Sequence, residues 1–271
     1  MIHKVLNSSS SAEPILLFNE FVLRADKSDS SVVISSPLNW CLNPGDRLAV
    51  MTSNSFLSYQ LMATLVDFVE PISGEIVLQG TVSWPLAGQG GLHSSLTIDN
   101  SFEFLSSIYS DSLERSHVSS DDFFDVLKTQ LIDSSMTLRE LAKDQKDFFF
   151  AALSILFSFD ICIAPHSKYL LFLMSRDAKS LRNLFRKQLD GGLCMITNAK
   201  NNRFKREFCN RGMVLGPLGK VIFDGDLEEA IAFSKQNDII DSSSEADDSQ
   251  FDYGESLTNS NSSQPEDDVD F

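Results

Sequence analysis

Positive charge is scarce in this sequence. Its 271 residues contain 22 Lys and Arg against 38 Asp and Glu, which gives a formal net charge of −16. A general nucleic-acid binder needs many cations to neutralise phosphates, so this balance argues against that function. The acidity is concentrated at one end, because residues 241–271 hold ten acids and no Lys or Arg. The remainder of the chain is only mildly acidic, with a formal charge of −6.

Cysteine is also rare, and the spacing of the cysteines indicates no metal site. The four residues, Cys41, Cys162, Cys194 and Cys209, lie far apart and form no C-x-x-C pair. That pattern suits neither a disulfide scaffold nor a zinc ribbon. We therefore expect free thiols in the core of a protein from a reducing compartment.

Long hydrophobic runs are missing. The most apolar stretch, residues 148–159, is shorter than the roughly 20 residues that span a bilayer, and Asp160 follows it. Residues 1–14 are polar and Ser-rich, with no apolar segment of the kind found in signal peptides. These features predict a cytoplasmic protein, with residues 148–159 forming a buried helix that runs into a strand.

Composition divides the chain into three parts. We expect a disordered start at 1–13, a folded domain at 14–236 with a helical subdomain at about 101–158, and a disordered acidic tail at 237–271. The tail has too few apolar residues to offset the entropy of ordering. It is interpreted as a solubilising segment, and the alternative is an acidic docking segment.

Apolar runs between turn signals predict the elements of the folded domain. We expect strands at 15–18, 21–23, 32–34, 48–51, 75–78, 161–164, 193–196, 213–215 and 221–223. We expect helices at 60–69, 177–189 and 227–233, beside the helical stretch at 101–158. Strands that alternate with helices indicate an α/β domain with a mostly parallel sheet, to which the opening strands add an antiparallel β portion.

The loop between the predicted strand at 48–51 and the predicted helix at 60–69 has the setting of a phosphate-binding P-loop. In such loops glycines let backbone N–H groups surround phosphate, and a lysine reaches the outer phosphates. This loop reads T-S-N-S-F-L-S-Y at 52–59 and contains neither residue type. The loop therefore has the position of a P-loop, between a strand and a helix, and lacks the residues that bind phosphate.

Further segments carry a resemblance to a known family. The chain reads P-I-S-G-E-I at 71–76, G-T-V-S-W-P at 80–85, G-G at 90–91 and S-L-T at 95–97. At this spacing it resembles the ATP-binding subunits of ABC transporters, in particular those that export capsular polysaccharide across the bacterial inner membrane. The resemblance implies an α/β, ABC-type P-loop NTPase-like fold, with a mostly parallel sheet, an antiparallel β portion and a helical subdomain.

The resemblance also implies where nucleotide-binding residues would lie, and the sequence departs from the family there. The family's phosphate-binding lysine falls at Ser58 and its magnesium-binding hydroxyl at Tyr59. Its glycines fall at Ser55 and Leu57. The full set of P-loop-equivalent positions is Asn54, Ser55, Phe56, Leu57, Ser58 and Tyr59.

The remaining catalytic positions are replaced as well. The family's metal-sensing glutamine falls near His93, its Asp and Glu of the Walker B motif at Pro165 and His166, and its switch histidine at Asn198. The signature motif falls on residues 142–145, with Asp144 where the partner's γ-phosphate would approach, and the adenine-stacking aromatic is absent around Arg24.

These replacements together predict an inactive member of an ATPase family. No G-K-[ST] occurs anywhere in the chain, so a shift of register cannot restore the loop. ATP and Mg²⁺, the cofactors that the resemblance implies, are predicted to be lost. We expect a structural or regulatory component of a polysaccharide exporter. The alternatives are a detached scaffold that works through the acidic tail and, contradicted by the residues, a competent ATPase.

The resemblance also implies partners. These are an integral-membrane polysaccharide-export permease, a competent ATP-binding subunit, or both, in a homodimer or heterodimer, with no nucleic acid. The contact with the membrane subunit is expected at Trp84, Pro85 and His93. The expected location is then peripheral, at the cytoplasmic face of the bacterial inner membrane.

Three weaker signals remain. His166 near Asp160 could suggest a metal ligand or a general base, although a lone His is usually ordinary. The run at 148–150 is three phenylalanines that we do not expect to point inward together, so one is expected at an interface. The basic cluster is interpreted as a solvated helix face, or else as a contact for phospholipid or the acidic tail; it comprises Lys200, Arg203, Lys205 and Arg206.

Overall fold

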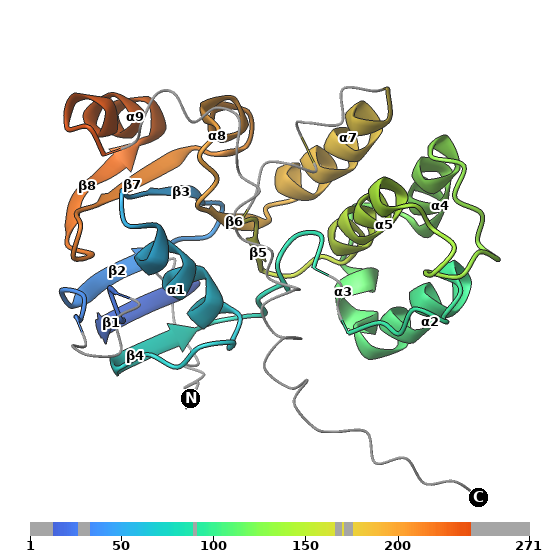
Figure 1. Ribbon diagram of the computed structural model, residues 1–271, viewed down its shortest axis with the longest axis horizontal. Coiled ribbons are helices and arrows are strands. Elements are labelled where there is room, and N and C mark those ends of the chain that lie inside the picture. Colours follow the sequence, from blue (N-terminus) through green and yellow to red (C-terminus); the bar gives the residue numbers. More distant parts are fainter. Residues whose placement is uncertain (1–12, 27–32, 89–90, 166–169, 171–175, 240–271) are drawn as a thin grey trace, which may run out of the picture.

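Two sheets and a group of helices make up the computed structural model, which describes residues 13–26, 33–88, 91–165, 170 and 176–239 (Figure 1). The smaller sheet is antiparallel, in the order β2-β1-β4. Its strands are β1 (Leu16–Val22), β2 (Leu38–Leu42) and β4 (Ser73–Leu78). The antiparallel β portion predicted from the opening strands is therefore confirmed, although β2 was not predicted.

The larger sheet has the order β5-β6-β3-β7-β8. Its strands are β3 (Arg47–Met51), β5 (Ile161–Ile163), β6 (Cys194–Thr197), β7 (Arg211–Leu215) and β8 (Val221–Asp226). The first four run parallel, and β8 returns antiparallel to β7. Strands β5 and β6 are buried throughout, as expected for parallel strands that are covered on both faces.

Helix α1 (Ser55–Leu65) follows β3 and packs on the apolar core that the two sheets share. The sequence predicted a helix at 60–69, so the observed helix begins and ends earlier. It begins at Ser55 because the side chain of Asn54 caps its first turn. It ends before Asp67, whose left-handed backbone (φ 59°) does not continue a helix.

Four helices form a separate group at the right of Figure 1. They are α2 (Ile98–Ile108), α3 (Ser110–Glu114), α4 (Ser120–Thr129) and α5 (Lys143–Leu156). Helix α7 (Arg176–Asp190) packs against α4 and α5 and so joins this group to the sheet. The last two helices are α8 (Asn202–Phe208) and α9 (Leu227–Gln236), and α9 covers β7 and β8.

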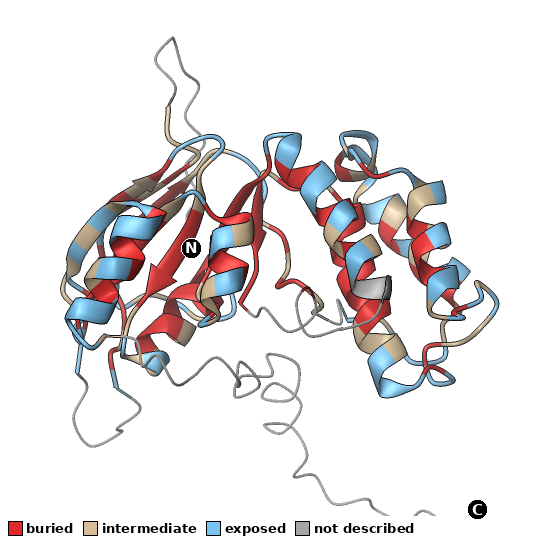
Figure 2. Ribbon diagram, turned by 90° about the horizontal axis from the view of Figure 1, so that it is seen from above, coloured by how far each residue is buried: buried red, intermediate tan, exposed pale blue. Residues whose placement is uncertain are grey.

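The phenylalanines of α5 all point inward, so the prediction that one of them faces a partner is wrong. Phe148 and Phe149 are 0% exposed and Phe150 is 3% exposed. The reason is that α5 contacts both α4 and α7, so more than one of its faces is covered. Figure 2 shows buried residues, in red, along the helices of the group at its right. Phe149 also contacts the ring of Phe123 on α4.

The predicted strand at 32–34 lies partly outside the described residues. Within them, Ile34 forms an isolated bridge with Arg24. The α/β class with a mostly parallel sheet is confirmed by the order and direction of the strands. Among the residues that the structure describes, none of the helices has both the length and the apolar character needed to cross a bilayer.

All four cysteines are free thiols, as predicted, and two of them are expected to be unreactive. Burial raises the pKa of Cys162 and of Cys209 to about 12. Since the thiolate is the nucleophile, iodoacetamide at pH 8 should alkylate both at least ~10-fold more slowly than the half-exposed Cys41. Mass spectrometry of peptides after timed quenching measures this, with fully denatured protein as the control. Equal rates at Cys162 and Cys41 in the folded protein would contradict the assignment of Cys162 to the core.

Candidate functional site

The loop between β3 and α1 is held closed by the side chain of Asn54. Its Oδ1 accepts the N–H of Leu57 (2.9 Å), which satisfies one donor at the start of α1. Its Nδ2 donates to the carbonyl oxygens of Ala25 and Pro217, both at 2.9 Å. One amide group thus joins the loop to the segment after β1 and to the β7–β8 turn.

Leu57 fills the space beneath this loop. It is 0% exposed and belongs to the apolar core between the sheets. Its side chain also lies against Gly219, where an added Cβ would stand 3.0 Å from Leu57 Cδ2. Glycine keeps a P-loop open because it has no side chain to pack. Here the equivalent position contributes a core residue instead.

Ser58 and Asn198 lie side by side at the carboxyl end of the larger sheet. The Nδ2 of Asn198 donates to Oγ of Ser58 at 2.8 Å. They meet because β3 and β6 are parallel neighbours, so the residues that follow the two strands share one edge. The structure therefore brings together the two positions where the sequence placed the lost lysine and the lost switch histidine. The contact between them is a hydrogen bond between two neutral side chains.

The Walker B positions offer no metal ligand within the described part of the chain. Pro165 is buried two residues after the end of β5 and has no side-chain atom that could bind a metal. His166 lies outside the described residues. Asp160, considered above with His166, is engaged elsewhere: it accepts the N–H of Thr81 at 2.7 Å and pairs with Arg115 at 3.1 Å. Across the residues that the structure describes, no group of three or more His, Cys, Asp and Glu is arranged to hold a metal.

The signature-equivalent segment opens α5 and is used for capping. The Oε1 of Gln145 accepts the N–H of Ala142 at 3.0 Å, and its Nε2 donates to the carbonyl of Gln130 at 2.9 Å. Asp144 is exposed in the first turn. A carboxylate there suits the positive end of the helix and repels a phosphate that approaches it.

Trp84 points into the protein. Its indole Nε1 donates to Oγ of Ser154 on α5 at 2.7 Å, and its ring packs against Tyr109, Phe157 and Phe159. Trp84 is half-buried and the next residue, Pro85, is buried. The tryptophan that was expected to face a membrane subunit therefore also fastens its loop to α5.

His93 differs from Trp84 because it is exposed. Its Nδ1 lies 2.7 Å from Oγ of Ser95, and its carbonyl accepts the N–H of Leu96. These bonds form a tight local turn ahead of the cap of α2. Of the three expected contact residues, His93 is the one on the surface.

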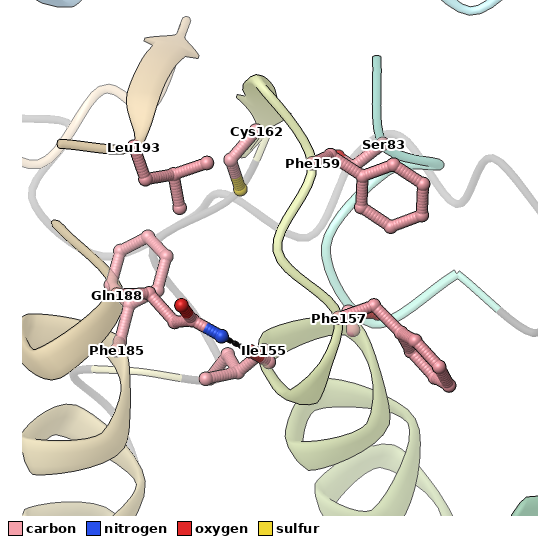
Figure 3. Close-up of a pocket in the computed structure, with 9 residues that line it drawn as sticks. Ser83, Ile155, Phe157, Phe159, Cys162, Phe185, Gln188 and Leu193 are labelled. Atoms are coloured by element: carbon pink, nitrogen blue, oxygen red, sulfur yellow. Dashed lines mark hydrogen bonds between the residues drawn. The ribbon is translucent and has the colours of Figure 1, made fainter. Parts of the chain in front are cut away.

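A small cavity lies behind the Trp84 loop, between β5, α5 and α7 (Figure 3). Its volume is about 10 Å³, which is room for one water molecule, so it is not a ligand pocket. Gln188 of α7 lines it and donates to the carbonyl of Ile155 at 2.8 Å and to Oγ of Ser116 at 2.7 Å.

Sequence reasoning missed Gln188, although the sequence contains a signal for it. Gln188 is 1% exposed and falls at the helical spacing of Leu181, Leu184 and Phe185, all of them buried. A polar residue on the apolar face of an amphipathic helix must find partners inside the protein.

Comparisons with known proteins find relatives in structure and none in sequence. No protein-family model matches the chain, and no curated protein matches it. A solved ATP-binding subunit of an ABC transporter has a TM-score of 0.57 at 12% identity, over 83% of this chain and 94% of that chain. The dimeric MJ0796, a bacterial ABC transporter cassette, has a TM-score of 0.57 at 16% identity, over 78% and 98%. The protein cbiO1 from Clostridium perfringens, part of the ABC transporter complex cbiONQ, has a TM-score of 0.56 at 16% identity, over 82% and 92%.

These similarities define the fold of the chain. It has the ABC-type P-loop NTPase-like fold, as the sequence resemblance implied. The similarity covers 78–83% of this chain and 92–98% of the solved chains. At 12–16% identity the likeness concerns the fold alone.

Proposed function

We propose that this chain is a catalytically inactive relative of ABC transporter ATP-binding subunits. It keeps their fold and has lost nucleotide chemistry. One observation carries the proposal: the loop that should receive phosphate is closed by its own residues. Asn54 occupies the Leu57 N–H, and Leu57 packs into the core beneath the loop.

The other replaced positions support the same reading. Phosphoryl transfer depends almost entirely on charges and ligands that hold phosphate and Mg²⁺ in place. Ser58 and Asn198 bond to each other, and Pro165 supplies no ligand atom. Asp144 adds negative charge where a partner's γ-phosphate would lie. We therefore infer that neither ATP nor Mg²⁺ is a cofactor of this chain.

We further propose that the chain is a structural or regulatory component of a bacterial polysaccharide exporter. The support is the sequence resemblance at 80–85 and 95–97, where G-T-V-S-W-P and S-L-T match the capsular polysaccharide branch. Its partners would be the integral-membrane permease, a competent ATP-binding subunit, or both. Its place would then be peripheral, at the cytoplasmic face of the inner membrane. MJ0796, which has the same fold, was solved as a dimer.

The membrane subunit is proposed to contact the loop around His93. Because Trp84 also supports the fold, its replacement cannot test that contact, and His93 is the better position. We expect His93→Glu to reduce co-purification of the permease at least ~10-fold, since it places a charge in a desolvated contact. The measurement is quantitative mass spectrometry of permease recovered with the tagged chain from native membranes.

Lys235→Glu provides the matched control, because Lys235 is exposed at the end of α9 and belongs to no proposed contact. It should leave recovery of the permease unchanged. Equal recovery with His93→Glu and with wild type would rule out the contact. The alternative of a detached scaffold rests on the ten acids of residues 241–271, and it predicts that removing their charge abolishes partner association.

A further inference from the structure

Positive charge in this acidic protein is gathered in one stretch. Residues 176–207 contain nine Lys and Arg against three Asp and Glu, out of 22 Lys and Arg in the whole chain. This stretch spans α7, β6 and α8. Residues 241–271 have the opposite character, with ten acids and no Lys or Arg. One chain thus carries a basic surface and a polyanionic segment.

Ion pairs place the basic residues of the two helices next to each other. Glu207 of α8 pairs with Arg182 of α7 at 3.8 Å and also with Arg186 of α7. The two helices therefore present one surface, which we call the α7–α8 basic face. Its members are Lys179, Arg182 and Arg186 of α7, Arg203 and Arg206 of α8, and Lys200, which lies two residues before α8. Lys205 is not a member, because it is 0% exposed.

The face keeps an excess of positive charge. Its six cations stand against Glu207, Glu228 and Asp190 in the same region. Five of the six are exposed: Lys179, Arg186, Lys200, Arg203 and Arg206. An exposed surface with several cations attracts a flexible polyanion through many weak, salt-sensitive contacts.

Helix α9, which leads to the acidic segment, lies beside α8. Arg206 of α8 pairs with Glu228 of α9 at 2.8 Å, so α8 and α9 lie side by side. Helix α9 ends at Gln236, and the acidic residues start at Asp241. A chain of 31 residues can extend to roughly 100 Å, so its length is sufficient to reach α8 and α7. Tethering supplies a local concentration on the order of millimolar.

We propose that residues 241–271 bind the α7–α8 basic face of the same chain and shield it from other polyanions. Charge complementarity, the position of α9 beside α8 and the length of the segment carry this inference. An anionic membrane or a nucleic acid is a poorer occupant, because the whole chain has a net charge of −16 and would be repelled. This inference is independent of the proposed function.

Zero-length carbodiimide cross-linking of the full chain tests the proposal, since it joins carboxylates to lysines that they touch. We expect cross-links from 241–271 to Lys179 and Lys200 at least ~5-fold above those to Lys220. Lys220, on the β7–β8 turn, is also exposed and serves as the internal control. Raising NaCl to ~0.5 M should abolish the difference, because it shortens the screening length to a few Å.

Two comparisons make the test decisive. Mixing ¹⁵N-labelled and unlabelled chains distinguishes cross-links within one chain from those between copies. A variant with all ten acids of 241–271 changed to Asn or Gln keeps the length, and it should gain binding to vesicles of 30% phosphatidylserine. Equal cross-linking at Lys220, cross-links only between copies, or equal vesicle binding by variant and wild type would each overturn the proposal.

Discussion

Replacing Phe149 with Ala is expected to lower the free energy of unfolding by about 3–5 kcal/mol. Phe149 is 0% exposed at the centre of α5, and its ring contacts Phe123 and Phe150. Truncation removes most of the side chain and leaves a cavity between α4 and α5 that the packed helices cannot collapse to fill. Urea unfolding followed by circular dichroism measures the loss.

Phe104→Ala on α2 is the matched control. Phe104 is 50% exposed, so the same change of side chain removes little packing, and the free energy of unfolding should change by less than about 0.5 kcal/mol. If the two variants lost similar stability, α5 would not be the central helix of the group, and the arrangement described for α4, α5 and α7 would be wrong.

Trp84→Ala is expected to lower the free energy of unfolding by a similar amount, about 3–5 kcal/mol. The indole packs on Tyr109, Phe157 and Phe159, and its N–H is bonded to Ser154. Trp84→Phe separates the two contributions, because it keeps an aromatic ring and removes the donor. We expect Trp84→Phe to cost about 1 kcal/mol, the usual net value of one hydrogen bond.

Thermal unfolding of both Trp84 variants checks this prediction. A Trp84→Ala protein as stable as wild type would mean that the indole does not fasten its loop to α5. Trp84 would then again be a candidate for the contact with a partner. A loss with Trp84→Phe as large as with Trp84→Ala would assign the effect to the hydrogen bond and not to packing.

The sequence was sufficient for the fold class and for the setting of the candidate site. Apolar runs predicted the parallel strands and the loop after β3, because buried strands have a simple local pattern. The closing contacts of that loop could not be predicted in the same way. Asn54 bonds to Ala25 and Pro217, which are 29 and 163 residues away in the chain, and only the assembled sheets bring those carbonyls together.

Two expectations failed or changed for a related reason. The run at 148–150 was expected to leave one ring exposed, because a helix usually has a single buried face. Helix α5 is covered by both α4 and α7, so that rule does not apply to it. Trp84 was assigned to a partner contact from the resemblance alone, and its bond to Ser154 crosses 70 residues of sequence.

The central claim is that the closed loop between β3 and α1 no longer binds nucleotide. Thermal unfolding of the purified chain with and without millimolar Mg-ATP tests it most directly. A ligand present at about a hundred times its dissociation constant stabilises a fold by about 2.7 kcal/mol, which is an easily visible shift of the melting temperature. We predict no shift, because Asn54, Leu57 and Ser58 are engaged within the protein. A clear rise of the melting temperature with Mg-ATP, but not with Mg²⁺ in the absence of ATP, would contradict the account. The hydrolysis of ATP would then have to be assayed.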